Sequence, residues 1–267
     1  MAQLLEGPSI VSTHESGISY TRKDQHYREN PALLELTNID KHLRIPASSL
    51  MIKSIENSIP RLETFLSQLK LHTEKSPRID IPNKDKKKSA RLIIDEINET
   101  FIELEFNKPV PCVAKELADI WYTIIGAVNT YGLHNRIINE FYPIIIHNIF
   151  PRKKFLSNEQ LVLRHKTNME KRFKSLKRVI YERRNVKKLN LKLAEMLAST
   201  WNLIEDYGLA EKFDQIFQIV ADDNMNKTSV DNTGKAVKGS DYVKGNAEVL
   251  IAEVLGIKDF ENPYNKQ

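Results

Sequence analysis

The chain contains one cysteine, nine glycines and eleven prolines in 267 residues, and these low counts exclude several classes of protein. The single thiol, Cys112, cannot form an internal disulfide and is typical of a reducing compartment. Glycine and proline are too rare for a collagenous or low-complexity chain. No apolar run approaches the roughly 20 residues of a membrane helix, and the first residues lack the features of a signal peptide. We therefore expect a cytoplasmic protein with no membrane partner.

What remains is ordinary globular material with an excess of positive charge. Hydrophobic residues make up 41% of the sequence and charged residues 28%, which is enough for one large core or two smaller ones. The net charge is +5 and the isoelectric point is about 9.0, which indicates an anionic partner without specifying it.

Apolar residues recur at the helical period along most of the chain, which predicts an all-α fold. We expect Pro60 to kink or restart the first helix, and Gly132 to end the third in a left-handed C-cap. Residues 223–246 are polar and contain glycine, so they are predicted to form a loop. The predicted helices cover residues 49–69, 85–106, 113–131, 135–149, 156–184, 189–207, 210–222 and 247–255.

Two sets of these helices have related sequences. A shift of about 76 residues aligns the Tyr-Gly-Leu segments at 131–133 and 207–209, and it aligns Leu-Ala-Asp at 117–119 with Leu-Ala-Glu at 193–195. The absence of gaps indicates an ancient tandem duplication, although two helical hairpins of similar length can also align by chance. The predicted units are an N-terminal extension at 1–48, a first half at 49–152 and a second half at 153–267.

The first half carries two acidic pairs on neighbouring helices. Glu96 and Glu99 lie one turn apart on one helix, and Glu116 and Asp119 lie one turn apart on the next. A short connection makes the two helices antiparallel, so we expect all four carboxylates to converge at one level. Four like charges repel unless a divalent cation neutralises them, and oxygen ligands suit Mg²⁺ or Mn²⁺. Acidic pairs are also common on solvated helix faces, so these residues alone leave both interpretations open.

The same residues resemble a known family. The segments Arg-Leu-Ile-Ile-Asp-Glu-Ile-Asn-Glu at 91–99 and Lys-Glu-Leu-Ala-Asp-Ile-Trp-Tyr at 115–122 are similar to the signature of the MazG-like all-α nucleoside triphosphate pyrophosphohydrolases. Ser-Pro-Arg at 76–78 and the segment Asn-Met-Asn-Lys at 224–227, followed by Gly-Lys, Lys-Gly and Tyr242, resemble the phosphoribosyl-ATP-pyrophosphohydrolase-like branch of phages and bacteria. The resemblance extends over roughly residues 60–245.

This resemblance implies a hydrolase acting on phosphoric anhydrides, which cleaves a (deoxy)nucleoside triphosphate to the monophosphate and pyrophosphate. Mg²⁺ or Mn²⁺ would be bound by Glu96, Glu99, Glu116 and Asp119. Asp95 stands where the family has a glutamate that orients or deprotonates water, and together with Glu96 it would be catalytic. The substrate-binding residues implied are Arg91, Asn224, Lys227, Lys235, Lys238 and Tyr242.

The second half departs from the family pattern. Arg172, Ser175 and Lys192 stand where metal ligands would be, and only Glu195 is acidic. We therefore expect a single-chain pseudo-dimer of two diverged MazG-like helical bundle halves, with one complete site and with further homodimerisation left open. One alternative is a catalytically weak relative that binds nucleotides or has a regulatory role. Another is a nucleic-acid-associated helical protein that uses the basic stretch at 164–188, although this stretch has few aromatic residues for base stacking.

Overall fold

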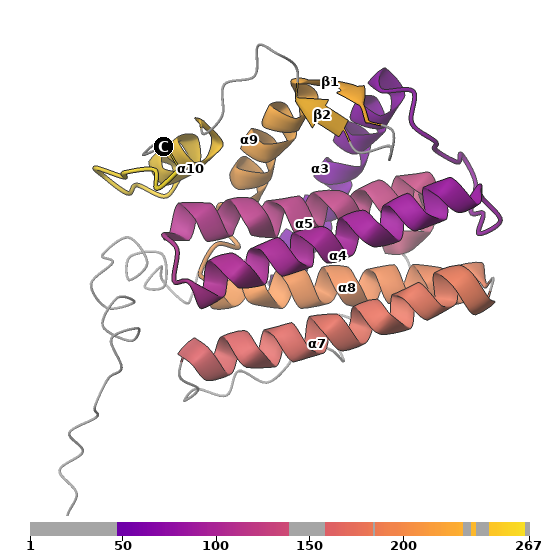
Figure 1. Ribbon diagram of the computed structural model, residues 1–267, viewed down its shortest axis with the longest axis horizontal. Helices are drawn as coiled ribbons and strands as arrows, with labels where there is room; N and C mark the ends of the chain where they lie inside the picture. Colours follow the sequence, from indigo (N-terminus) through magenta and orange to yellow (C-terminus); the bar gives the residue numbers. More distant parts are fainter. Residues whose placement is uncertain (1–46, 139–157, 184, 232–235, 239–245, 265–267) are drawn as a thin grey trace, which may run out of the picture.

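The structure is a computed structural model that describes residues 47–138, 158–183, 185–231, 236–238 and 246–264 (Figure 1). This part of the chain is all-α apart from one short hairpin, which confirms the predicted fold class. Residues 134–138 are also helical, and the remainder of the predicted helix at 135–149 lies outside the described residues. The elements are α3 (Ala47–Gln68), α4 (Asn83–Glu105), α5 (Val110–Thr130), α7 (Asn158–Arg178), the π-helical turn η1 (Val179–Arg183), α8 (Val186–Asp206), α9 (Phe213–Met225), β1 (Lys227–Val230), β2 (Ala236–Lys238) and α10 (Asn246–Val254).

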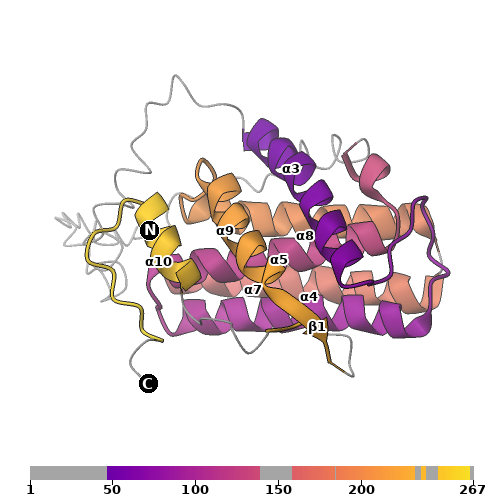
Figure 2. The same cartoon turned by 90° about the horizontal axis from the view of Figure 1, so that it is seen from above.

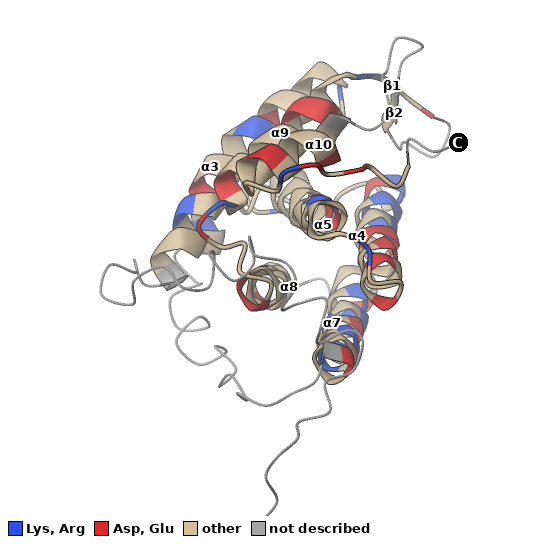
Figure 3. Cartoon of the chain, turned by 90° about the vertical axis from the view of Figure 1, so that its left-hand side faces the viewer, with Lys and Arg blue, Asp and Glu red and all other residues tan. Residues whose placement is uncertain are grey.

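Four long helices lie side by side and form the body of the molecule (Figure 1). α4 packs on α5, α5 on α8, α8 on α7 and α7 on α4, which closes a four-helix bundle that Figure 3 shows end-on. α3, α9 and α10 pack on the other side of α5, and α3 and α9 cross above the bundle in Figure 2. α5 is therefore buried nearly all round, which explains why its sequence is the most apolar of the long helices.

The core is centred on aromatic residues from α5, α8 and α9. The rings of Trp121 and Trp201 are 5.8 Å apart, and the ring of Phe213 lies 5.4 Å from Trp121 and 5.7 Å from Trp201. Both tryptophans are buried. Edge-on and tilted contacts of this kind stabilise a core beyond the apolar area that they bury. None of the described helices combines the length and the apolarity that are needed to cross a membrane.

α5 and α8 have the same length and end in the same way. Each has 21 residues and is followed by a glycine with positive φ, 65° at Gly132 and 70° at Gly208. The N–H of Leu133 donates to the carbonyl of Val128 (2.9 Å), and the N–H of Leu209 makes the corresponding bond, also of 2.9 Å. These bonds complete a Schellman motif after each helix, and the left-handed C-cap predicted at Gly132 is confirmed.

α3 continues through Pro60, where we predicted a kink or a restart. The proline removes one backbone hydrogen bond, but side chains of α5 hold the two residues that precede it. Trp121 Nε1 donates to Ser58 Oγ (3.0 Å), and Asn129 Nδ2 donates to the carbonyl of Ile59 (3.0 Å). Tertiary contacts therefore outweigh the local preference of proline.

Two further predictions were wrong at their boundaries. α5 begins at Val110 rather than at residue 113, because Pro111 lies in the first helical turn, where a missing N–H costs nothing. The segment predicted as a loop begins with the last turn of α9 and then forms β1 and β2, which are antiparallel and pair Lys227 with Lys238 and Val230 with Ala236. Their few β-branched residues are enough to form a hairpin within a polar segment.

Candidate functional site

A cluster of three carboxylates lies where α4 packs on α5. Glu96 projects from α4, and Glu116 and Asp119 project from α5 one turn apart, so the antiparallel pairing brings them together. One oxygen from each residue lies within 4.8 Å of the others. Glu116 is only 9% exposed, and its Oε2 has no hydrogen-bond partner in the part of the chain that the structure describes. A buried acceptor of this kind requires a cation or an ordered water.

The environment of the cluster favours its protonated forms. Burial, followed by the negative charges of Asp119, Glu99 and Glu116, raises the pKa of Glu96 to about 8. Burial also raises the pKa of Glu116 to about 7, although Lys115 acts in the opposite direction. Both carboxyl groups therefore change charge near neutral pH, where ordinary glutamates are fully ionised.

Lys115 partly neutralises the cluster. Its Nζ lies 2.8 Å from Glu116 Oε1 and 2.8 Å from Asp119 Oδ2. Burial lowers the pKa of Lys115, but the two carboxylates more than offset this effect and raise it overall, so the lysine stays charged. Sequence reasoning did not assign Lys115 a role. Its position one residue before Glu116 and four before Asp119 was the available signal, because residues four apart on a helix face each other.

The other predicted residues of α4 lie outside the cluster. Glu99 is exposed and is not among the three carboxylates that meet, although its charge raises the pKa of Glu96. Asp95 is half-buried, and its Oδ2 lies 3.9 Å from Arg91 Nε. The structure thus brings together three of the four predicted metal ligands.

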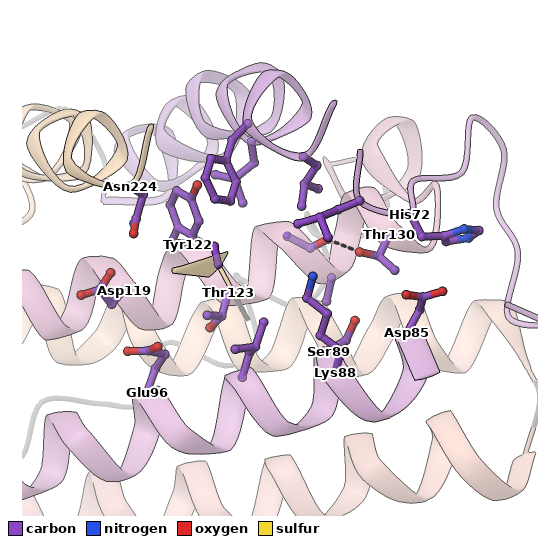
Figure 4. A pocket seen from close by; sticks show the side chains of 18 of the residues that line it. His72, Asp85, Lys88, Ser89, Glu96, Asp119, Tyr122, Thr123, Thr130 and Asn224 are labelled. Carbon is purple, nitrogen blue, oxygen red and sulfur yellow. Dashed lines mark hydrogen bonds between the residues drawn. The ribbon is translucent and has the colours of Figure 1, made fainter. Parts of the chain in front are cut away.

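A pocket extends from this cluster along α4 and α5. Figure 4 shows Glu96 and Asp119 at one end and Asp85 and His72 at the other. The middle is apolar, and its lining residues include Leu62, Phe65, Leu66, Leu92 and Gly126. This combination of apolar walls with a few polar groups is typical of small-molecule sites.

The second half of the chain contributes polar groups beside the carboxylates. Asn224, near the end of α9, and Lys227, at the start of β1, both line the pocket. Lys227 Nζ donates a hydrogen bond to Asn224 Oδ1. Lys238 belongs to β2 opposite Lys227. The two remaining predicted substrate residues, at positions 235 and 242, lie outside the described residues.

The end of the pocket away from the carboxylates is also polar, and sequence reasoning gave no binding role to Asp85, Ser89 or His72 there. Asp85, Lys88 and Ser89 line it from the first turns of α4, and His72 lines it from the segment before that helix. The sequence does contain an indication of this end of the pocket. Asp85, Ser89, Leu92 and Glu96 are spaced by three or four residues, so they lie along one face of the helix.

Between α7 and α8, two basic side chains surround a single carboxylate. Lys192 Nζ lies 2.8 Å from Glu195 Oε1, and Arg172 Nη1 lies 3.6 Å from Glu195 Oε2. These side chains are largely shielded from solvent, with 14% exposure for Arg172 and 17% for Glu195. Two cations and one carboxylate are not a set of metal ligands. By contrast, Lys171, Lys174 and Lys177 of the same basic stretch are exposed.

Comparison with known proteins identifies no relative. No protein-family model matches the chain, and no curated protein and no solved structure matches it. The chemistry of the site therefore follows from the residues and distances given above.

Proposed function

We propose that this protein is a divalent-metal-dependent nucleoside triphosphate pyrophosphohydrolase, which cleaves a (deoxy)nucleoside triphosphate to the monophosphate and pyrophosphate. The observation that carries the proposal is a single pocket with a carboxylate cluster at one end and Asn224 and Lys227 beside it. The same residues carry the resemblance to the MazG-like family.

The cluster fits a hard cation. Glu96, Glu116 and Asp119 offer only oxygen atoms within 4.8 Å of one another, and the buried Oε2 of Glu116 has no partner among the described residues. Such ligands suit Mg²⁺ or Mn²⁺, and Glu99 is near enough to add its charge. When bound, the ion would neutralise the triphosphate and lower the pKa of a water molecule.

The side chains of this chain supply the other parts of the reaction. A bound cation would keep Glu96 ionised, and its carboxylate would then be available to accept a proton from water. Lys227 is held by Asn224 on the side of the pocket contributed by the second half, where its ammonium group can pair with a phosphate oxygen. The apolar walls around Phe65 and Leu66 exclude water from the neighbouring part of the ligand.

We also propose that the two halves arose by tandem duplication and pack as a pseudo-dimer. In support, α5 and α8 have equal lengths and equivalent glycine caps. With the shift of about 76 residues, Arg172 corresponds to Glu96 and Glu195 to Asp119. Arg172 contacts Glu195 between α7 and α8, and Glu96 lies near Asp119 between α4 and α5. In this arrangement the first half supplies the metal ligands and the second half supplies Asn224 and Lys227.

The proposal is tested by measuring pyrophosphate release from the four deoxynucleoside triphosphates and four ribonucleoside triphosphates with Mg²⁺, Mn²⁺ or EDTA. We expect metal-dependent release of pyrophosphate and monophosphate, and a loss on the order of 100-fold in Glu116→Gln, which removes a charged ligand. Glu105→Gln is the matched control, because Glu105 is an exposed residue of α4 that contacts Lys166 and lies outside the pocket.

Three outcomes would contradict the proposal: no release with any nucleotide, release that persists in EDTA, or full activity of Glu116→Gln. Binding of nucleotides without cleavage would favour a catalytically inactive relative. Binding of nucleic acid without cleavage would point to the exposed lysines of α7 as the functional surface.

A further inference from the structure

The polar end of the pocket contains two opposite charges that the hydrolytic chemistry does not use. Asp85 and Lys88 lie in the first turns of α4 and both line the pocket (Figure 4). The Oδ2 atom of Asp85 is buried and has no hydrogen-bond partner among the described residues. Burial lowers the pKa of Lys88, while the charge of Asp85 raises it. A buried acceptor beside a desolvated ammonium group is costly unless a ligand satisfies both.

The position of these groups indicates which part of a ligand they meet. Along α4, Asp85 precedes Glu96 by eleven residues, which corresponds to about 16 Å along the helix axis. Apolar side chains such as Leu92 and Phe65 line the space between. A ligand that reaches both ends is therefore elongated, with anionic groups at the carboxylate end and a hydrogen-bonding edge at the Asp85 end. If the proposed function holds, on which this inference rests, the phosphates lie at the first end and the base at the second.

The donor and acceptor properties of the two side chains restrict the base. A carboxylate only accepts hydrogen bonds, and an ammonium group only donates them. The base must then offer N–H donors to Asp85 and an acceptor to Lys88. Guanine offers two neighbouring donors, at N1 and N2, beside the O6 acceptor, whereas adenine, cytosine and thymine each offer one donor group on that edge.

We propose that Asp85 and Lys88 determine base specificity and select guanine nucleotides. Asp85 accepts from the N1 and N2 groups of the base, and Lys88 donates to O6. Ser89, which lies beside them in the pocket, is in a position to accept or donate a further bond. The two charged residues act on the base and not on the phosphates, so their loss changes which nucleotide is bound rather than the metal chemistry.

Binding of monophosphates in the presence of Mg²⁺ tests the proposal independently of catalysis, because a monophosphate has no anhydride bond to cleave. The dissociation constants of dGMP, dIMP, dAMP, dCMP and dTMP are measured by calorimetry for the wild type, Asp85→Asn and Lys88→Met. We expect the wild type to bind dGMP about tenfold or more tightly than the others, including dIMP, which lacks the N2 amino group. In Asp85→Asn the advantage of dGMP over dIMP should disappear, while the affinity for dTMP changes little.

Matched controls come from residues of the same types nearby. Asp80→Asn and Lys87→Met alter exposed residues that do not line the pocket, and they should leave all five dissociation constants unchanged. Circular dichroism and thermal unfolding of each variant establish that it is folded.

The assignment is overturned if the wild type prefers a base other than guanine, if it binds none of the monophosphates, or if Asp85→Asn weakens binding of all five equally. A triphosphate panel run in parallel separates this result from the proposed function. If no triphosphate is cleaved while dGMP binding still depends on Asp85, the hydrolase proposal fails and the base site stands. If cleavage occurs without base preference, the base site fails alone.

Discussion

At the scale of single residues, charge balance decides how the carboxylate cluster behaves. Glu96 and Glu116 are held beside Asp119 by the packing of α4 on α5, so they cannot move apart freely to relieve repulsion. Only a proton, the ammonium group of Lys115 or a bound cation can do so. The stability of the protein should therefore depend both on pH and on the binding of a metal ion to the cluster.

The pH dependence of stability follows from Glu96. Burial and the neighbouring carboxylates raise its pKa from the ordinary 4.5 to about 8 in the folded protein. The folded state therefore holds more protons between these values, and its stability falls as pH rises. Without metal, Glu96→Gln should match the wild type near pH 4.5 and be more stable by about 1–3 kcal/mol at pH 8.5. Urea unfolding of both proteins across this range measures the difference. A difference that is constant with pH, or that shrinks as pH rises, would contradict the role of Glu96.

Lys115→Met should separate the effect of the internal ammonium group from that of a metal ion. The variant loses the positive charge that contacts Glu116 and Asp119, so we expect metal-free unfolding free energy to fall by about 1–3 kcal/mol. Its affinity for Mn²⁺ should rise about tenfold, because the lysine no longer competes for the same oxygens. Calorimetric titration with Mn²⁺ gives the affinity. Lys108→Met, at a residue before α5, serves as the control, and equal or weaker Mn²⁺ binding by Lys115→Met would refute the competition.

The sequence predicted which helix face each carboxylate lies on, but it did not predict which of the carboxylates meet. Spacing by three correctly placed Glu116 and Asp119 on one side of α5, but the same spacing on α4 left Glu99 exposed. Residues three apart differ by about 60° around a helix, so packing decides whether both reach the same point. The sequence places Asp85 on the same stripe of α4 as Glu96, but the pocket wall that this stripe faces is contributed by other elements.

At the scale of elements, the helical period predicted nearly every long helix, although α8 begins three residues earlier and α9 three residues later than predicted. Other errors lie where proline or short strands occur. Pro60 is tolerated because Trp121 and Asn129 hold the helix from outside, which no local pattern reveals. Pro111 was assigned to the connection before α5, although it lies in the first turn of that helix. The hairpin has only short strands and too little alternation to be distinguished from a loop.

The cap of α5 allows a quantitative test at this scale. Gly132 has a φ of 65°, and an added Cβ would lie 2.3 Å from the carbonyl oxygen of Ser76, which is backbone and cannot move away cheaply. Gly256 has a similar φ of 71° but no atom within 4 Å of such a Cβ. Gly132→Ala therefore combines backbone strain with a clash, whereas Gly256→Ala has strain alone.

We expect Gly256→Ala to lower the free energy of unfolding by about 1–2 kcal/mol and Gly132→Ala by at least about 3 kcal/mol. Gly132→Ala should also disturb the pocket, because the backbone N–H of Glu74 and that of Arg78 donate to carbonyls at the end of α5 (3.2 and 3.0 Å). Urea unfolding of the two variants provides the comparison. Equal losses would show that the segment before α4 yields to the added methyl group.

At the scale of the whole molecule, two similar helix pairs hold opposite kinds of charge at their interfaces. α4 and α5 meet at carboxylates, whereas α7 and α8 meet at Arg172 and Lys192 around Glu195. In the first arrangement Lys115 offsets the negative charge only in part, whereas in the second a single carboxylate pairs with two cations. One interface should therefore depend on metal and the other should not.

Corresponding substitutions in the two halves test this difference. Glu195→Gln leaves Arg172 and Lys192 without a carboxylate in a largely shielded place, so it should lower unfolding free energy by about 1–3 kcal/mol both with and without Mn²⁺. Asp119→Asn reduces repulsion in the first half, so we expect it to retain or gain stability without metal and to lose the stabilisation that Mn²⁺ gives the wild type. Urea unfolding of the wild type and both variants at pH 8, with and without Mn²⁺, gives the six values needed. Loss of the Mn²⁺ effect in Glu195→Gln, or its persistence in Asp119→Asn, would contradict a metal site in the first half. A bound ion stabilises the folded protein only while the residues that bind it are present.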